Sequence, residues 1–144
     1  MKLEELYALW DLDSDIDTTD LGNESIKIPK LHNKYYKAYI TEKILLRKYE
    51  SEMKSLKLAK YEFYTQGPSA ETKELGWSIP SRGMILKQEI PMYMEGDKEI
   101  IALSLKIGLQ QEKVELLESI IKSLVNRGFQ IKSAIDWHKF TMGA

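Results

Sequence analysis

The chain contains no cysteine among its 144 residues. Disulfide bonds, a thiol nucleophile and cysteine-ligated zinc are therefore excluded. Histidine is scarce too: His32 and His138 stand far apart in the sequence, and we expect each to be packed or solvated. The isolated glycines form no phosphate-binding loop, and no grouping of serine, histidine and aspartate stands out. These absences predict that the protein is not an enzyme and has no catalytic residue, no metal site and no cofactor.

Long apolar runs are missing as well. No stretch approaches the roughly 18 apolar residues that a membrane-spanning helix needs. Residues 1–6 lack the apolar core of a signal peptide. Hydrophobic residues make up 43% of the chain and charged residues 30%, a balance typical of a globular chain with long exposed helices. We therefore expect a cytosolic protein that does not associate with membranes.

Charge is distributed in blocks along the chain. Residues 1–26 carry one cation and eight anions, a net of −7, whereas residues 27–60 carry ten cations and three anions, a net of +7. Residues 61–144 carry ten cations and eleven anions, which brings the total to −1. Such a basic block in a nearly neutral chain indicates a local surface for an anionic partner. Three kinds of partner fit: nucleic acid, an acidic protein, or the chain's own N-terminus.

The acidic N-terminal block has two parts. Leu3, Leu6, Tyr7 and Trp10 have the spacing of a short amphipathic helix. Residues 11–20 contain alternating aspartates, but the glycine and the final glutamate of a calcium-binding loop are out of register. We therefore favour a solvated loop there, or a cap for the next helix.

A long helix is predicted over residues 29–66. Pro29 is suited to its first turn, and Gly67-Pro68 to its end. At alternating steps of four and three residues from Leu31, eight of ten positions are apolar, and Glu42 is one of the two exceptions. This pattern indicates a coiled-coil-like seam.

A second long helix is predicted from about Asp97, which would cap it, to Arg127, with Gly128 as a left-handed C-cap. A short apolar helix should follow over residues 129–140. Gln110 alone interrupts the apolar seam of the long helix. Five residues of this seam are predicted to be buried, partly between subunits: Ile107, Val114, Leu117, Ile121 and Leu124. The apolar tail, which includes Phe129 and Ile135, requires a partner surface, so these two residues join the oligomerisation candidates.

The segment between the two long helices is less regular. Residues 67–83 are rich in glycine, proline and serine, which predicts a loop. Residues 84–94 fit either a short helix or a short extended piece, because Pro91 interrupts any longer helix. The predicted fold class is mainly α, with long helices in a bundle or coiled-coil-like arrangement and a loop or short extended pieces near residues 67–96.

The basic helix interleaves cations with tyrosines, the combination that sequence-tolerant binders of single strands use. Lysine neutralises phosphates, and tyrosine offers a flat face on which an unpaired base stacks. The competing interpretation is that the cations form a solvated face and the tyrosines fill the core. The nucleic-acid-binding candidates are Lys43, Arg47, Lys54, Lys57, Lys60, Tyr61 and Tyr64, and another flank of the same helix carries Lys30, Lys34 and Lys37.

Residues 16–25, 29–36, 61–67 and 126–140 together give the chain a resemblance to a known family. In their order and spacing the chain resembles the UvsY recombination mediators of T4-type phages. The family carries a Lys-x-Arg pair for DNA binding just before the end of this helix. Here Lys60 stands at the arginine position, Leu58 at the lysine position, and Lys57 is the adjacent cation.

The resemblance implies a function. Such mediators bind single-stranded DNA and help to load the phage recombinase onto strands covered by the phage single-strand-binding protein, in the cytoplasm of the infected bacterium. They have no catalytic site or cofactor, and they act as a ring-like homo-oligomer of about six to eight subunits that assembles through C-terminal helices. Residues 1–96 would then be the DNA-binding region and residues 97–144 the oligomerisation region. The alternative is a helical scaffold or adaptor without nucleic-acid binding, whose acidic N-terminus folds onto the basic helix.

Overall fold

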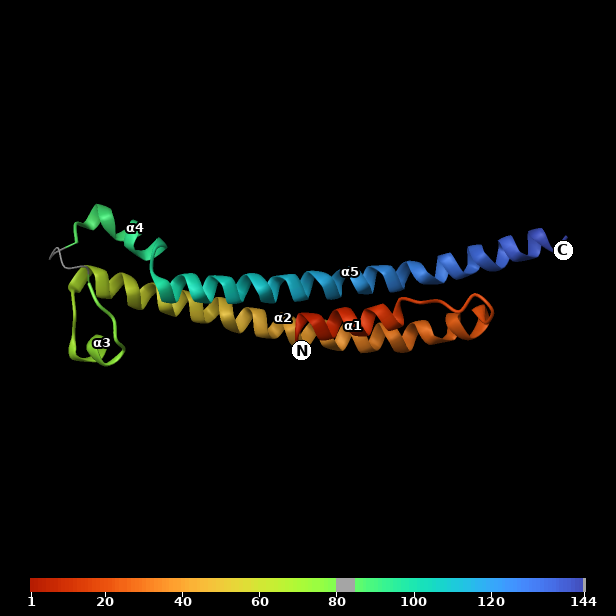
Figure 1. Ribbon diagram of the computed structural model, residues 1–144, viewed down its shortest axis with the longest axis horizontal. Helices are drawn as coiled ribbons and strands as arrows, with labels where there is room; N and C mark the ends of the chain where they lie inside the picture. Colours follow the sequence, from red (N-terminus) through yellow and green to blue (C-terminus); the bar gives the residue numbers. More distant parts are fainter. Residues whose placement is uncertain (80–84, 144) are drawn as a thin grey trace. The chain divides into compact units, whose positions relative to one another are not determined.

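The computed structural model describes residues 1–79 and 85–143, and every element in these ranges is helical (Figure 1). The predicted mainly α fold class is confirmed. The elements are α1 (Leu3–Asp13), α2 (Leu21–Gln66), α3 (Ala70–Glu74), a 3-10 helix η1 (Lys87–Glu89), α4 (Ile90–Glu95) and α5 (Lys98–Thr141).

The chain divides into two compact units, and both long helices contribute to each. Unit 1 comprises Met1–Ile44 and Gln110–Ala144, and unit 2 comprises Leu45–Leu109. These boundaries interrupt α2 and α5 rather than falling between elements. The functional division near residue 96 that the sequence suggests stays a prediction.

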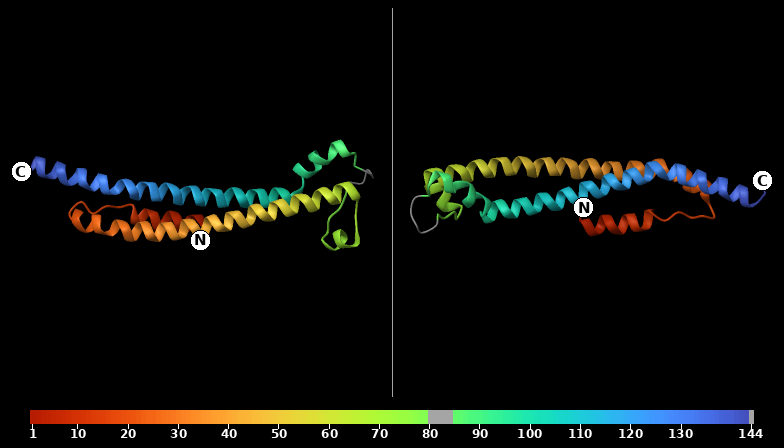
Figure 2. Two further views of the ribbon diagram at one scale, coloured as in Figure 1. Left: turned by 180° about the vertical axis from the view of Figure 1, so that it is seen from behind. Right: turned by 90° about the horizontal axis from the view of Figure 1, so that it is seen from above.

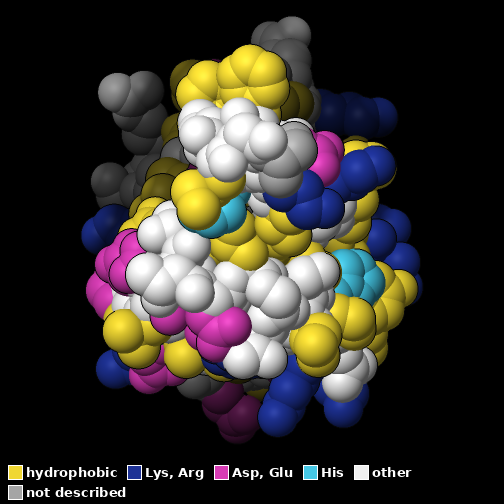
Figure 3. All heavy atoms as spheres, turned by 90° about the vertical axis from the view of Figure 1, so that its right-hand side faces the viewer, with side chains coloured by type: hydrophobic (Ala, Val, Ile, Leu, Met, Phe, Trp, Pro, Cys, Tyr) yellow, Lys and Arg dark blue, Asp and Glu magenta, His cyan; other side chains and the backbone are white. Residues whose placement is uncertain are grey.

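Unit 1 is built from α1, the first part of α2 and the last part of α5, and α1 runs antiparallel to α2 (Figures 1 and 2). The amphipathic spacing of α1 places Leu6 in the core, as expected. The fully buried side chains in the core of unit 1 come from all three helices: Leu6, Tyr35, Leu117, Ile120 and Leu124. Burying each such side chain contributes about 1.5–3 kcal/mol. Figure 3 looks onto the end of this unit at which α5 finishes, where hydrophobic side chains remain visible beside charged ones.

Polar groups inside unit 1 are paired. The Gln110 amide donates to a carboxylate oxygen of Glu42 at 2.7 Å and to its carbonyl at 2.8 Å. The buried Arg127 guanidinium lies 5.4 Å from the centre of the Trp10 ring and donates to the Ser14 carbonyl. Over residues 1–79 and 85–143, no buried side-chain nitrogen or oxygen lacks a hydrogen-bond partner, as the cost of burying an unpaired one requires.

Unit 2 contains the second part of α2, the short helices and the start of α5. Phe63, Ile90 and Ile100 are its buried apolar side chains. Gly67 adopts φ +86°, and its N–H donates to the Phe63 carbonyl at 2.9 Å, so it ends α2 as predicted. Asp97 caps α5, as predicted, because its carboxylate accepts the N–H groups of Glu99 and Ile100.

Two predicted helix boundaries are wrong. The helix that we expected to start at Pro29 starts at Leu21, where the Asp20 carbonyl accepts the Glu24 N–H. Pro29 is tolerated inside α2 because the carbonyl it leaves unpaired belongs to Ser25, which is exposed to water.

The second wrong boundary is Gly128. We expected it to end the second long helix, but α5 continues through it to Thr141. Leu124, Arg127 and Ile131 are buried on both sides of this glycine, so one packed stripe holds the helix together. A glycine inside a helix costs only about 1 kcal/mol relative to alanine, which the packing offsets.

The segment between the long helices is more helical than predicted. Ser69 caps α3 by accepting the Thr72 N–H, within the stretch expected to be a loop. Pro91 stands in the first turn of α4, where an N–H has no partner within the helix, so the missing one costs nothing. Of the two alternatives for residues 84–94, the short helix is therefore correct for the part that the structure describes. Residues 80–84 of this segment lie outside the described ranges.

Candidate nucleic-acid interface

The structure separates the ten cations of residues 27–60 into paired and unpaired ones. Lys27 pairs with Glu24, Lys34 with Asp13 at 2.6 Å, and Lys60 with Asp97 at 3.1 Å. The other seven of these ten cations make no ion pair with any residue of 1–79 or 85–143: Lys30, Lys37, Lys43, Arg47, Lys48, Lys54 and Lys57.

Four of the predicted DNA-binding residues share an exposed face of α2 in unit 2. We call Arg47, Lys54, Lys57 and Tyr61 the Arg47 face. At about 100° per residue, Arg47, Lys54 and Tyr61 fall within an arc of about 40°, with Lys57 beside them. All four are exposed, and 43% of Tyr61 is accessible. From Arg47 to Tyr61 the face extends about 21 Å along the helix.

Two neighbours complete the description of these candidates. Leu58, at the position of the family's lysine, is 61% exposed between Lys54 and Tyr61 and adds apolar surface. Lys43 lies in unit 1 and is half-buried; its Nζ is 3.3 Å from the Tyr39 hydroxyl and 5.3 Å from the centre of that ring. The Lys43 charge thus faces tyrosine rather than a carboxylate.

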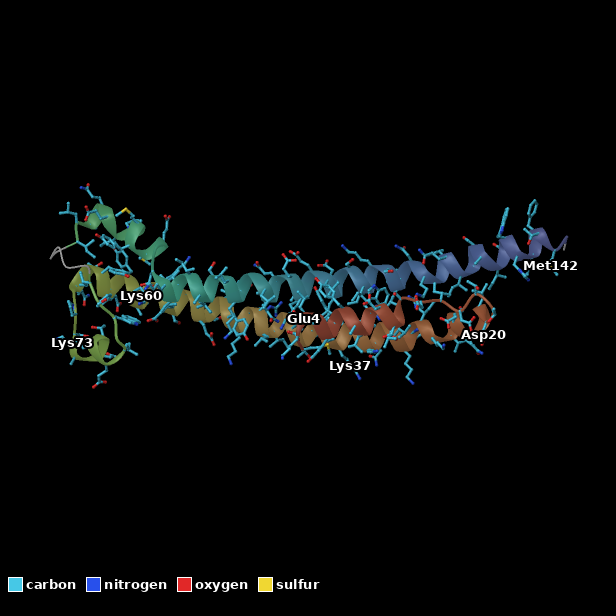
Figure 4. All side chains as sticks on the ribbon, in the orientation of Figure 1. Glu4, Asp20, Lys37, Lys60, Lys73 and Met142 are labelled. Atoms are coloured by element: carbon cyan, nitrogen blue, oxygen red, sulfur yellow. The ribbon has the colours of Figure 1, made fainter. Side chains whose placement is uncertain are left out.

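The polar groups of the remaining two candidates, Lys60 and Tyr64, already have partners within the chain. We call Lys60, Tyr64, Trp77 and Asp97 the Asp97 cluster; Figure 4 labels Lys60 near the start of α5. Lys60 is only 4% exposed, and its Nζ lies 3.9 Å from the centre of the Trp77 ring as well as against Asp97. Tyr64 donates its hydroxyl to Asp97 at 2.6 Å. The polar groups of both side chains are thus used inside unit 2, and a direct contact of either with DNA stays a prediction.

The electrostatics of the Asp97 cluster agree with this structural role. Burial would raise the pKa of Asp97, but the hydrogen bonds from Tyr64 and the Ile100 N–H and the nearby Lys60 ammonium hold it below its ordinary value. Burial and the hydrogen bond to Asp97 raise the pKa of Tyr64, so the hydroxyl keeps its proton and remains a donor. Asp97 therefore stays ionised and links α2 to the start of α5.

The predicted oligomerisation residues also divide into two groups. Val114, Leu117 and Leu124 are buried in the core of unit 1, and Ile121 packs against that core. Ile107 and Ile135 are half-buried, and Phe129 is 72% exposed. Most of the predicted seam is therefore covered within one chain.

Large apolar side chains do remain exposed near the end of α5. We call Val125, Phe129, Trp137 and Phe140 the C-terminal apolar face, and all four are more than half exposed. The Trp137 and Phe140 rings stack with their centres 5.7 Å apart. Several large apolar side chains exposed on one side of a helix are typical of an interaction surface. Among the predicted oligomerisation residues only Phe129 belongs to it.

A comparison with known protein families identifies the family of the chain. A family model described as "Recombination, repair and ssDNA binding protein UvsY" matches residues 9–144. The chain belongs to the UvsY family. The predicted family membership is thus confirmed over nearly the whole length.

Crystal structures of the bacteriophage T4 recombination mediator protein UvsY have the same fold as this UvsY-family chain. One crystal form, Lattice Type II, is 20% identical with a TM-score of 0.83 and covers 99% of this chain and 98% of that one. Lattice Type IV is 18% identical with a TM-score of 0.78 and covers 98% and 99%. At such identities the likeness establishes the fold alone. No curated protein matches the chain.

Two features of the described residues of this UvsY-family chain bear on other classes of function. No group of three or more histidine, aspartate or glutamate side chains is placed to hold a metal ion within residues 1–79 and 85–143. Over the same ranges, no helix combines the length and the apolar character needed to cross a bilayer.

Proposed function

We propose that this protein is a single-stranded DNA-binding recombination mediator. The observation that carries the proposal is the Arg47 face on a chain of the UvsY family. This face has three exposed cations, which have no carboxylate partner in residues 1–79 and 85–143, beside an exposed tyrosine. The cations would neutralise phosphates, and Tyr61 would stack on an unpaired base. This chemistry tolerates any sequence, as a mediator that acts along a whole strand requires.

Binding becomes strong through several copies. A single face offers few contacts, so we propose that subunits assemble into a ring-like oligomer through the C-terminal apolar face and the half-buried Ile135. Each subunit then adds one Arg47 face, and an attached strand meets the next face at a high effective concentration. In this scheme the DNA contacts lie within residues 1–96 and the assembly contacts within residues 97–144.

The shared track suggests how loading proceeds. A strand held along several subunits is kept extended, and its phosphates are withdrawn from the single-strand-binding protein that covers it. The phage recombinase then receives a strand with free bases, in the cytoplasm of the infected bacterium. No step needs a catalytic residue or a cofactor, because each exchanges one set of non-covalent contacts for another.

The adaptor alternative has one observation in its favour: α1 packs on α2 and Asp13 pairs with Lys34. This contact neutralises a single cation in unit 1, however, and leaves Arg47, Lys54 and Lys57 without carboxylate partners in the described residues. A contact with one cation supports the adaptor alternative less than the three unpaired cations of the Arg47 face support DNA binding.

The test measures the salt dependence of oligo-dT binding by fluorescence anisotropy for matched variants. Each phosphate contact contributes about 0.7 to the slope of log affinity against log salt, so Lys54→Gln and Lys57→Gln should each lower the slope by about that amount. Lys48→Gln is the control, because Lys48 is also exposed and unpaired but lies about 120° around the helix from Lys54. Equal losses in all three variants, or salt-independent binding by the intact protein, would exclude the Arg47 face.

A further inference from the structure

A second basic surface lies on α2 within unit 1. Lys27, Lys30, Leu31, Asn33, Lys34 and Lys37 line a hollow there. Lys30, Lys34 and Lys37 lie within an arc of about 60°, and their spacing is four residues and then three. Asp13 already neutralises Lys34, whereas Lys30 and Lys37 are exposed and have no carboxylate partner among the described residues. We call these three residues the lysine hollow.

The outer side of α1 carries a complementary pattern. Glu4, Ala8 and Asp11 also lie within an arc of about 60°, on the side of α1 that faces away from the buried Leu6. All three are exposed, and neither carboxylate pairs with a cation in the described part of the chain. We call these three residues the acidic stripe; Figure 4 labels Glu4 on α1 and Lys37 on α2.

The two surfaces match position by position. The acidic stripe also has a spacing of four residues and then three, so a parallel alignment places Glu4 opposite Lys30 and Asp11 opposite Lys37. In that alignment Lys34, whose charge Asp13 neutralises, faces the small and uncharged Ala8. In each surface the two outer side chains are about 10 Å apart along the helix axis.

Within one chain the two surfaces do not meet. The Met1 amine contacts Glu42 and Asp13 contacts Lys34, so α1 is fixed antiparallel to α2 with its apolar side inward. The complement that each surface lacks is present on every other copy of the chain. We infer that the acidic stripe of one copy binds the lysine hollow of the next.

This contact goes beyond the proposed function, because it needs no DNA and differs from the C-terminal apolar face. It joins two different surfaces, which generates a ring when the rotation between neighbours closes. Exposed ion pairs contribute little affinity and weaken with salt, so the contact sets the direction and register of assembly while apolar burial supplies most of the affinity. The lysine hollow would then serve assembly and leave the Arg47 face to DNA.

The experiment compares two full-length chains by sedimentation velocity at low and high salt. One carries Glu4→Lys with Asp11→Lys, and the other carries Lys30→Glu with Lys37→Glu. At low salt each chain alone should need at least about tenfold more protein to assemble, which corresponds to about 1.4 kcal/mol. An equimolar mixture should assemble again, because each variant then meets the opposite charge on the other. Asp15→Lys is the control, since Asp15 is exposed outside α1 and its substitution should leave assembly unchanged.

Register is tested with two further chains. Glu4→Lys with Lys30→Glu should restore assembly in a single chain under the parallel alignment, whereas Glu4→Lys with Lys37→Glu should not. Circular dichroism confirms that each variant folds, and recovery in the mixture separates a lost contact from misfolding. Full assembly of both reversed chains alone, or no recovery on mixing, overturns the inference. The inference is also overturned if the Lys30→Glu/Lys37→Glu chain assembles normally but loses oligo-dT binding, because the lysine hollow would then be a DNA-binding surface. The contribution of Lys54 and Lys57 to DNA binding is measured in the separate experiment on the Arg47 face.

Discussion

The Arg47 face and the Asp97 cluster both take lysines from the second part of α2, but the lysines lie in opposite environments. Lys57 is exposed and pairs with no carboxylate in the part of the chain that the structure describes. Lys60, three residues later, is buried between a carboxylate and a tryptophan ring. Three residues rotate a side chain by about 300°, so Lys60 points about 60° closer to the apolar seam than Lys57 does. That rotation decides whether the ammonium group meets solvent or Asp97. A basic block is therefore a mixture of binding and structural cations, and only the position relative to the seam separates them.

The largest expected effect on stability comes from removing the buried carboxylate of the Asp97 cluster. Asp97→Ala removes the partner of buried Lys60, the acceptor for Tyr64 and the cap of α5. Removing one partner of a buried ion pair typically costs about 3–5 kcal/mol, so the free energy of unfolding should fall by about that amount. Urea denaturation followed by circular dichroism measures the change. The control is Asp136→Ala, which removes an exposed carboxylate and should change stability by less than about 0.5 kcal/mol. Similar losses in both variants would show that the Asp97 cluster is not a structural centre.

A smaller effect is expected from substituting two tyrosines of α2, one in the Arg47 face and one in the Asp97 cluster. Tyr61→Leu removes an exposed ring from the Arg47 face and should weaken oligo-dT binding by about 1–3 kcal/mol, with little change in stability. Tyr64→Phe keeps the ring but removes the hydroxyl that donates to Asp97, so it should lower the free energy of unfolding by about 1–3 kcal/mol and leave DNA affinity unchanged. Anisotropy and urea denaturation on both variants give the four values. The opposite assignment, with Tyr64→Phe impairing binding alone, would move the DNA surface onto the Asp97 cluster.

The sequence predicted much of the fold because periodicity reports directly which side of a helix is buried. The stripe in α1, the end of α2 at Gly67 and the cap at Asp97 all follow from local rules, and all are present. Pro29 and Gly128 were misread because a proline or glycine signal is local, whereas tertiary packing holds the helix on both sides of it. Local signals worth about 1 kcal/mol give way to a continuous buried stripe.

The candidate site was harder to predict because it depends on contacts between distant segments. Charge and tyrosine content located the basic helix, but nothing local distinguishes the pairing of Lys60 with Asp97, 37 positions later in the sequence. One long-range signal was present: Glu42 and Gln110 each interrupt an apolar seam, and they hydrogen-bond to each other. Two polar breaks in facing seams are a usable indication of contact, since each buried polar group needs a partner.

The smallest expected effect concerns the pH dependence of the stability that Asp97 contributes. The pKa of Asp97 is below its ordinary value in the folded chain, because donors around it outweigh the effect of burial. Its contribution to stability is therefore complete above the unfolded-state pKa of about 3.9 and is lost as the pH falls through the folded-state value. Asp97→Asn lacks this contribution, so its deficit in unfolding free energy relative to the intact protein should be largest near neutral pH and should shrink below about pH 4. Urea denaturation between pH 7 and pH 3 measures the two curves. A constant deficit for Asp97→Asn across this range would mean that Asp97 titrates alike in the folded and unfolded chains, and the donors around it would then not stabilise its ionised form.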